Sequence, residues 1–179
     1  MPSRPALIRP TTAADLGVIA EIFAYYVRNT VITFEQNPPG ARAWLELHGR
    51  LCELNLPFLV ADVDGTVAGY AYAGPWRPKP AYRFTAEDSV YLAPERRGMG
   101  LGRLLLQGLL EACAASGVRQ VLAVIADAGE PASIAVHRGC GFAEVGRLAE
   151  VGYKHGRWID TVILQRPVPL PPAPGSASV

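Results

Sequence analysis

Ser89-Val90-Tyr91-Leu92-Ala93-Pro94-Glu95-Arg96-Arg97-Gly98-Met99-Gly100-Leu101-Gly102-Arg103 is the stretch that decides the fold of this chain. It begins with an apolar pattern typical of a strand, continues through a glycine-rich loop, and ends at the start of a leucine-rich helix pattern. Glycine lets the backbone approach a bulky anion because it has no Cβ, and amides at a helix N-terminus point toward such an anion. Arginines on both flanks add positive charge. The stretch therefore predicts a turn that binds a diphosphate.

The glycine spacing narrows the choice of diphosphate. A Walker loop would need Gly-Lys followed by Ser or Thr, and this is absent. A dinucleotide loop would need a third glycine where Arg103 stands, counting from Gly98 and Gly100. The alternative is a tight turn that binds nothing, in which the glycines only avoid steric clashes, although such a turn does not require arginines beside it.

The segments on either side of this turn alternate between strand and helix patterns. Asp64-Gly65 is a strong hairpin signal, because both central positions of a type I′ turn need positive φ. The continuously apolar run 120–126 is typical of a strand covered on both faces. We expect strands at 6–9, 58–63, 66–73, 85–92, 120–126, 142–151 and 158–164, and helices at 12–27, 40–54, 101–116 and 131–138. The fold class is predicted to be α/β (α+β).

Composition sets the broad class of protein. The 179 residues suit one domain, predicted to span 1–166, with a proline-rich, unpacked tail at 167–179. No apolar run reaches the ~18 residues of a membrane span, and the start lacks a signal-peptide core, so we expect a cytoplasmic protein that does not bind membranes. The 17 basic and 16 acidic residues argue against a general nucleic-acid binder, although a local basic pocket remains compatible.

The three cysteines are dispersed through the chain. Cys52, Cys113 and Cys140 show no paired spacing, which predicts neither a disulfide framework nor a zinc site. We expect all three to be packing residues, and we expect no metal.

The pattern Arg97-x-x-Gly100-x-Gly102 resembles the loop with which GNAT acyltransferases hold the pyrophosphate of coenzyme A. Val90-Tyr91-Leu92 resembles the strand that receives the pantetheine arm of the coenzyme. The resemblance runs from Ile8 to Gln165 and is greatest to the phosphinothricin and methionine sulfoximine N-acetyltransferase group. The stretches that carry it are Thr33-Phe34-Glu35, Tyr70-Ala71, Ala81-Tyr82-Arg83, Glu87-Asp88-Ser89-Val90-Tyr91, Val151-Gly152-Tyr153-Lys154 and Gly156-Arg157-Trp158-x-Asp160.

This resemblance implies a central mixed, mostly antiparallel sheet flanked by helices, acetyl-CoA as co-substrate, a small amino acid-like amine as acceptor, and a homodimer. The coenzyme-binding residues that it implies are Val90, Tyr91, Leu92, Arg97, Gly98, Met99, Gly100, Leu101, Gly102 and Glu130. Glu130 departs from the family, which usually has an Asn that bonds the pantetheine at this point. A carboxylate accepts but does not donate, so we expect weaker coenzyme binding there.

Glu87 is the candidate general base, because the family has its catalytic Glu at this position and partial burial would raise its pKa. The alternative is an exposed acid at the start of a strand. Asp88 is expected to point to the opposite face of the sheet if the strand is regular. His137 is the second catalytic candidate, as a proton donor to the departing thiolate, or else it is a structural residue; both interpretations stay open.

The amine substrate is expected to bind beside a basic, aromatic segment at 76–83, because Arg recognises carboxylate or phosphinate groups bidentately. The residues implied are Phe34, Arg77, Tyr82, Arg83 and Tyr153, with Lys154 nearby. A solvated basic loop is the alternative. For the whole protein, the alternatives to an enzyme are a non-catalytic acyl-CoA-binding regulatory module and a dinucleotide oxidoreductase, the latter disfavoured by the glycine spacing.

Overall fold

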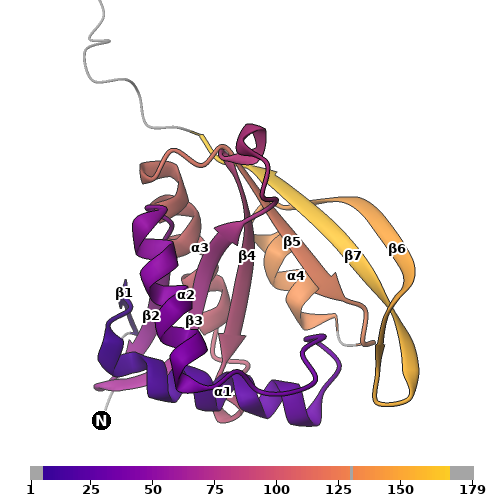
Figure 1. Ribbon diagram of the computed structural model, residues 1–179, viewed down its shortest axis with the longest axis horizontal. Helices are drawn as coiled ribbons and strands as arrows, with labels where there is room; N and C mark the ends of the chain where they lie inside the picture. Colours follow the sequence, from indigo (N-terminus) through magenta and orange to yellow (C-terminus); the bar gives the residue numbers. More distant parts are fainter. Residues whose placement is uncertain (1–5, 130, 170–179) are drawn as a thin grey trace, which may run out of the picture.

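A single sheet organises the described part of the chain, residues 6–129 and 131–169 of the computed structural model. Within these residues the sheet has seven strands in the order β1-β2-β3-β4-β5-β7-β6 (Figure 1). The strands are β1 Leu7–Pro10, β2 Phe58–Val63, β3 Thr66–Pro75, β4 Thr85–Leu92, β5 Gln120–Ala126, β6 Ala143–Lys154 and β7 Arg157–Pro167. The helices are α1 Leu16–Asn29, α2 Ala41–Glu53, α3 Leu101–Ala115 and α4 Ala132–Gly139. Short 3-10 turns occupy Ala13–Asp15, Pro80–Tyr82 and Pro94–Arg96.

The predicted α+β class is confirmed, because every neighbouring pair of strands in the described sheet is antiparallel except β4 and β5. The first helix differs at its start. The Thr12 amide and hydroxyl both donate to Asp15 at 2.8 Å and so cap the segment, but the chain makes a 3-10 turn before α1 begins at Leu16.

Described residues beyond position 166, the expected domain boundary, still belong to the sheet and the core. Strand β7 continues to Pro167, and Val168 is buried in the main apolar cluster. Its amide donates to the carbonyl oxygen of Arg119 at 2.9 Å, which ties this residue to the segment before β5. The remainder of the predicted tail, 170–179, lies outside the described residues.

The sheet separates two apolar layers. On one face, α1 and α2 pack over aromatic side chains, among them Phe23, Trp44 and Tyr70. On the other face, α3 and α4 lie behind the sheet in Figure 1, and Leu105 and Leu109 of α3 are fully buried there. Helices α1 and α3 therefore each bury one apolar face against the sheet.

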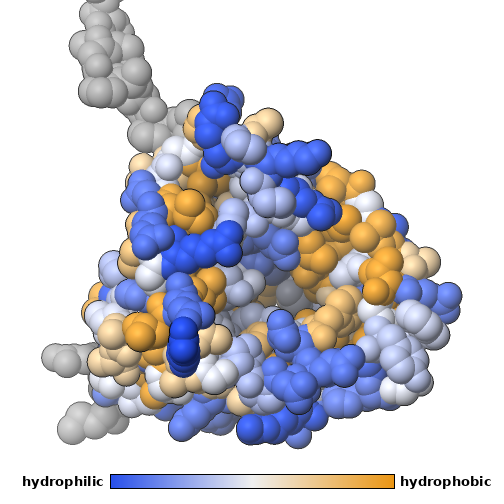
Figure 2. All heavy atoms as spheres, in the orientation of Figure 1, coloured by the Kyte–Doolittle hydropathy of each residue, from blue (hydrophilic) through white to orange (hydrophobic). Residues whose placement is uncertain are grey.

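The feature that positions the site is a parting of β4 from β5. These two parallel strands pair only at three positions, which end at Glu87 opposite Leu122. Beyond that point β4 remains paired with β3, while β5 remains paired with β7. The sheet consequently opens into a V in its middle (Figure 1), and Figure 2 shows a hollow at the centre of the same face.

Candidate active site

The opening between the two strands forms a cleft of about 570 Å³. Its walls come from β4, β5, the segment after α1, the glycine-rich turn and α4. The predicted site residues that line it are Phe34, Glu87, Val90, Tyr91, Leu92, Arg97, Gly98, Gly100, Gly102 and His137. Residues far apart in the sequence, such as Phe34 and Val90, thus meet in one cavity.

Several predicted residues lie outside this lining. Met99 is 54% exposed, and Leu101 is buried in α3. Glu130, the departure from the family pattern, lies outside the described residues, so its expected effect stays a prediction.

The glycine-rich turn adopts a backbone conformation that glycine permits. Gly98 and Gly100 have φ of +73° and +78°, a region that L side chains rarely adopt, and Gly100 is the N-cap of α3. The free amides at the start of α3 therefore face the cleft, together with the side chain of Arg103. This end of the cleft is suited to an anion.

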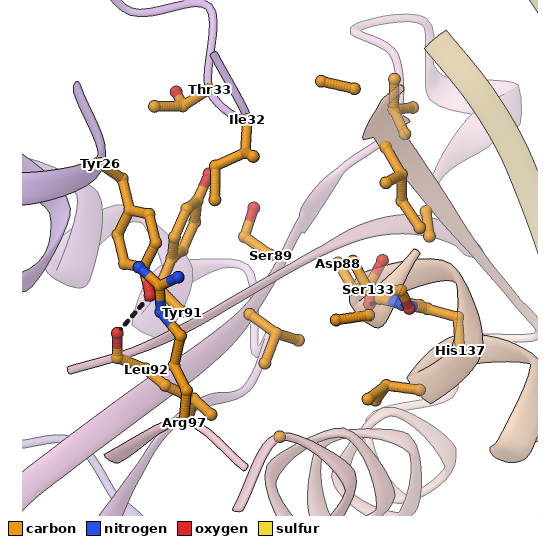
Figure 3. A pocket seen from close by; sticks show the side chains of 18 of the residues that line it. Tyr26, Ile32, Thr33, Asp88, Ser89, Tyr91, Leu92, Arg97, Ser133 and His137 are labelled. Atoms are coloured by element: carbon orange, nitrogen blue, oxygen red, sulfur yellow. Dashed lines mark hydrogen bonds and ion pairs between the residues drawn. The ribbon is translucent and has the colours of Figure 1, made fainter. Parts of the chain in front are cut away.

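Arg97 is positioned by aromatic side chains that the sequence did not single out. Its guanidinium lies 5.2 Å from the centre of the Tyr26 ring and 5.8 Å from that of Tyr25. The Tyr26 hydroxyl donates to the carbonyl oxygen of Leu92 at 2.6 Å, which joins α1 to the end of β4 (Figure 3). The helical spacing of α1 offered no signal for this role, because Tyr26 fits that spacing as one more apolar residue.

Glu87 stands at the closed end of the V, as the last residue of β4 that pairs with β5. It is partly buried, and burial raises the pKa of its carboxyl, with a further increase from Asp88 and a decrease from Arg77. A carboxylate with a raised pKa at the wall of a cleft is suited to accept a proton.

His137 and Asp88 form a buried pair on the α4 side of β4. His137 Nε2 lies 2.8 Å from Asp88 Oδ2, and its Nδ1 lies 2.7 Å from the carbonyl oxygen of Ser133 (Figure 3). A carbonyl oxygen can only accept, so Nδ1 carries a hydrogen. Burial alone lowers the pKa of His137, but the hydrogen bond and charge of Asp88, with the Ser133 carbonyl, raise it overall.

Both ring nitrogens of His137 are therefore engaged within the protein. Of the two interpretations left open by the sequence, this arrangement favours a structural ion pair, because the Nε2 hydrogen is directed at Asp88. The expectation that Asp88 points to the opposite face of the sheet from Glu87 agrees with its contact to α4, although both residues line the cleft. Ser133, one helical turn before His137, is the partner that helix spacing could have indicated.

Of the residues expected to bind the amine, few line the cleft. Phe34 lines the cleft, whereas Arg77 lies over the ring of Trp76 at 4.8 Å and Arg83 over the ring of Phe84 at 4.3 Å. Tyr82 is 44% exposed, and Tyr153 is 54% exposed. Arg77 still acts on Glu87 electrostatically. Thr33 and Ser89 line the cleft and were not singled out as binding residues, although each is adjacent to a predicted site residue.

The described residues give two further findings outside the cleft. None of their helices combines the length and apolar character needed to cross a membrane, and they contain no group of three or more His, Cys, Asp or Glu side chains placed to hold a metal. Cys113 and Cys140 are buried as expected, but Cys52 is exposed on α2, so the expectation that all three cysteines are packing residues was wrong for Cys52.

Comparison with known families decides the class of protein. Residues 19–142 match the acetyltransferase (GNAT) family. The chain belongs to that family. This GNAT acetyltransferase is 45% identical over 161 residues to a phosphinothricin N-acetyltransferase of Alcaligenes faecalis, covering 90% of this chain and 82% of the relative. It is 40% identical to an L-methionine sulfoximine/L-methionine sulfone acetyltransferase of Pseudomonas aeruginosa, covering 89% and 93%.

A solved structure supports the same assignment. A phosphinothricin acetyltransferase from Sinorhizobium meliloti, solved in complex with acetyl-CoA, superposes on this acetyltransferase with a TM-score of 0.87 at 44% identity, over 91% of this chain and 88% of the other. The recognised GNAT fold is confirmed, and the enzyme class is N-acetyltransferase. The oxidoreductase alternative is excluded by the family match.

Proposed function

We propose that this enzyme transfers the acetyl group of acetyl-CoA to the amino group of an amino acid-like substrate of the phosphinothricin or methionine sulfoximine type. The observation that carries the proposal is the course of the cleft. It begins at Glu87, where β4 and β5 part, and ends at the amides and arginines of the glycine-rich turn. A base and an anion-binding end therefore share one cavity. The activities of the relatives from Alcaligenes and Pseudomonas support the substrate class.

The described residues fit the coenzyme. The two glycines with positive φ and the N-terminus of α3 would hold its pyrophosphate, with charge from Arg97 and Arg103. The edge of β4 at Val90, Tyr91 and Leu92, which does not pair with β5, would bond the pantetheine arm. Met99 and Leu101, which flank Gly100 in the turn, would contribute backbone to the pyrophosphate end. The weaker contact expected at Glu130 stays a prediction. Bound acetyl-CoA would supply an activated acyl group and a thiol leaving group.

Glu87 would remove a proton from the substrate ammonium, directly or through a water, because only the free amine is nucleophilic. A backbone N–H of Tyr91 or Leu92 would stabilise the negative charge that develops on the acyl oxygen. His137 would maintain the α4 wall through its pair with Asp88. If it also protonates the leaving thiolate, the Nε2–Asp88 hydrogen bond must first break.

The acceptor would lie on the Glu87 side of the cleft, with Phe34 as an apolar wall. Arg77 and Arg83 would attract its carboxylate or phosphinate from the rim, Tyr82 would add apolar surface, and Tyr153 would be peripheral. Arg77 has the best support among these, since it already influences the pKa of Glu87.

We also infer a cytoplasmic homodimer with one catalytic domain per chain and no metal requirement. Light scattering coupled to gel filtration tests the dimer, and activity that survives prolonged treatment with a strong chelator tests the metal.

The direct test measures thiol release from acetyl-CoA with each of the twenty amino acids, phosphinothricin and methionine sulfoximine. We expect activity with the two analogues or a related amino acid. Glu87→Gln should lower kcat by roughly 10²- to 10⁴-fold while coenzyme binding persists. Full turnover in that variant would refute Glu87 as the base. Saturable coenzyme binding with no acetylation of any amine would instead support the regulatory-module alternative.

A further inference from the structure

Residues 31–34, the segment after α1, bridge the two sides of the V; we call them the 31–34 loop. Val31 is buried against Ile159 of β7 and Ala126 of β5. Two positions further on, the Thr33 side chain interacts with the hydroxyl group of Tyr91 on β4. Because the loop contacts elements on both sides of the cleft, its position determines the shape of the cavity. Thr33 and Phe34 both line that cavity.

The β6–β7 hairpin supports this loop at Gly152. A Cβ added to Gly152 would overlap three carbon atoms of the Phe34 ring, so the ring lies directly on the glycine backbone. Gly146, on the same strand, has no atom within 4 Å of the equivalent added Cβ. The absence of a side chain at Gly152 is therefore required by Phe34, and the φ of Gly152 is not in the left-handed region.

A bulge in β6 turns Gly152 toward the loop. The register with β7 shifts between Leu148 and Gly152, and Glu150 within the bulge has a φ of +53°. The Glu150 amide donates to Asp160 Oδ1 at 2.9 Å, which holds the bulge in place. Side chains alternate along a strand, so the bulge places positions 152 and 154 toward the loop and leaves Tyr153 54% exposed.

Lys154 makes the second contact between the hairpin and the loop. Its side chain is buried at 4% exposure, and Nζ donates to the carbonyl oxygen of Thr33 at 2.8 Å. Burial lowers the pKa of Lys154, while the charge of Glu35 raises it. An ammonium group is costly to bury, and here its hydrogen bond is made to the backbone of a residue that lines the cleft. The contact joins residues 121 positions apart in the sequence.

We propose that Gly152 and Lys154 are positioning residues that hold Phe34 and Thr33 as the acceptor-side wall of the cleft, and so determine which amino acid side chain fits. This rests on the function proposed above. Tyr91, which contacts Thr33, shares a face of β4 with Glu87, because the two are four residues apart on one strand. The wall therefore lies on the same face of β4 as the proposed base, while the glycine-rich turn that would hold the pyrophosphate follows the other end of that strand.

Steady-state kinetics on Gly152→Ala and Lys154→Met, with Gly146→Ala as the matched control, would test the proposal. Both variants should raise KM for the amine by about tenfold, since small displacements of a positioning element cost one to two orders of magnitude. KM for acetyl-CoA should stay within about twofold of wild type in the same variants. Gly146→Ala should match wild type in both constants.

The double variant Gly152→Ala/Phe34→Ala separates positioning from a general loss of structure. If Gly152 acts through the Phe34 ring, the double variant should be no worse than Phe34→Ala alone, because residues in contact are non-additive. Thermal unfolding of each variant identifies any that fail to fold; the double variant and Lys154→Met then decide the question, since neither introduces the overlap.

Equal changes in the two KM values, unchanged kinetics in Gly152→Ala and Lys154→Met, or additive effects in the double variant would each overturn the proposal. Failure of the proposed function has a different signature. In that case wild-type enzyme acetylates no amine in the panel, whereas failure of the positioning role leaves wild type active.

Discussion

Asp88→Asn should reverse the contribution of His137 to the pH dependence of stability. Burial tends to lower the pKa of His137, but the hydrogen bond and charge of Asp88 raise the folded-state value above the ordinary 6.5. The pair therefore contributes stability that is fully present below the unfolded pKa and is lost as pH rises through the folded pKa. In the variant the counter-charge disappears, and burial then lowers the folded-state pKa of His137. The variant should accordingly gain stability as pH rises through the region near 6.

The magnitude follows from the burial of the two side chains. The side chains of His137 and Asp88 are only 6% and 1% exposed. At pH 5 the variant must therefore either bury an unpaired imidazolium or keep the ring neutral at a pH where an exposed imidazole would be protonated. Removing one partner of a buried pair costs about 3–5 kcal/mol. Above pH 8 neutral His137 can accept a hydrogen bond from the side-chain amide introduced at position 88, and the loss should fall to roughly 1 kcal/mol. The slope for one proton cannot exceed about 1.4 kcal/mol per pH unit.

Urea unfolding of wild type and variant at half-unit steps from pH 5 to pH 9 measures the difference, in which groups common to both proteins cancel. The exposed carboxylate of Asp127, which pairs with Arg147 at 2.7 Å, supplies the control. Asp127→Asn should change stability little, and by the same amount at every pH in this range, because exposed ion pairs contribute little. A loss of stability in Asp88→Asn that is the same at pH 5 and pH 9 would refute the ion pair as described.

Three further predictions concern the cleft. Gly100→Ala places a Cβ at a φ of +78° and should lower the free energy of unfolding by about 1–2 kcal/mol. Calorimetry should also show weaker coenzyme binding; an unchanged affinity would mean that the turn is not part of the coenzyme site. The acid limb of kcat/KM for the amine should lie above the pH expected of an ordinary Glu, because burial, then Asp88, raise the pKa of Glu87; a limb at the ordinary position would show that another group is titrating. Tyr26→Phe removes the 2.6 Å hydrogen bond to the Leu92 carbonyl and should cost about 0.5–1.5 kcal/mol in chemical denaturation, whereas an unaltered midpoint would mean that this bond contributes nothing net.

Local pattern predicted most of the fold. The strands 58–63, 85–92 and 120–126 begin and end where expected, because an apolar run between turn-forming residues specifies both the conformation and its limits. Strand β6 was harder. It continues through a bulge with a positive φ at Glu150, which no hydrophobic pattern predicts, and its burial is almost uniformly low.

The candidate site likewise has parts that the sequence predicted and parts that it did not. The glycine-rich turn was predictable because its chemistry lies in consecutive residues, and glycine permits the positive φ found at Gly98 and Gly100. The tertiary contacts of the residues near this turn could not be predicted in the same way. Strand alternation predicted only the face of the sheet on which Asp88 lies, and its pairing with His137, 49 residues away, depends on where α4 packs. Tyr26 and Arg97 meet for a comparable reason, since α1 crosses the end of β4.

The amino-acid sequence by itself determined the class of fold and the anion-binding turn, since each depends on the spacing of neighbouring residues along one strand, loop or helix. The resemblance to the GNAT family, rather than the spacing, indicated Glu87 as the candidate base. Only the tertiary structure decided that β4 and β5 separate after Glu87, that His137 is held by Asp88, and that Gly152 and Lys154 support the wall at Phe34. These contacts join segments up to 121 residues apart. They are set by the order of strands in the sheet, and a linear pattern carries no record of which strand lies beside which.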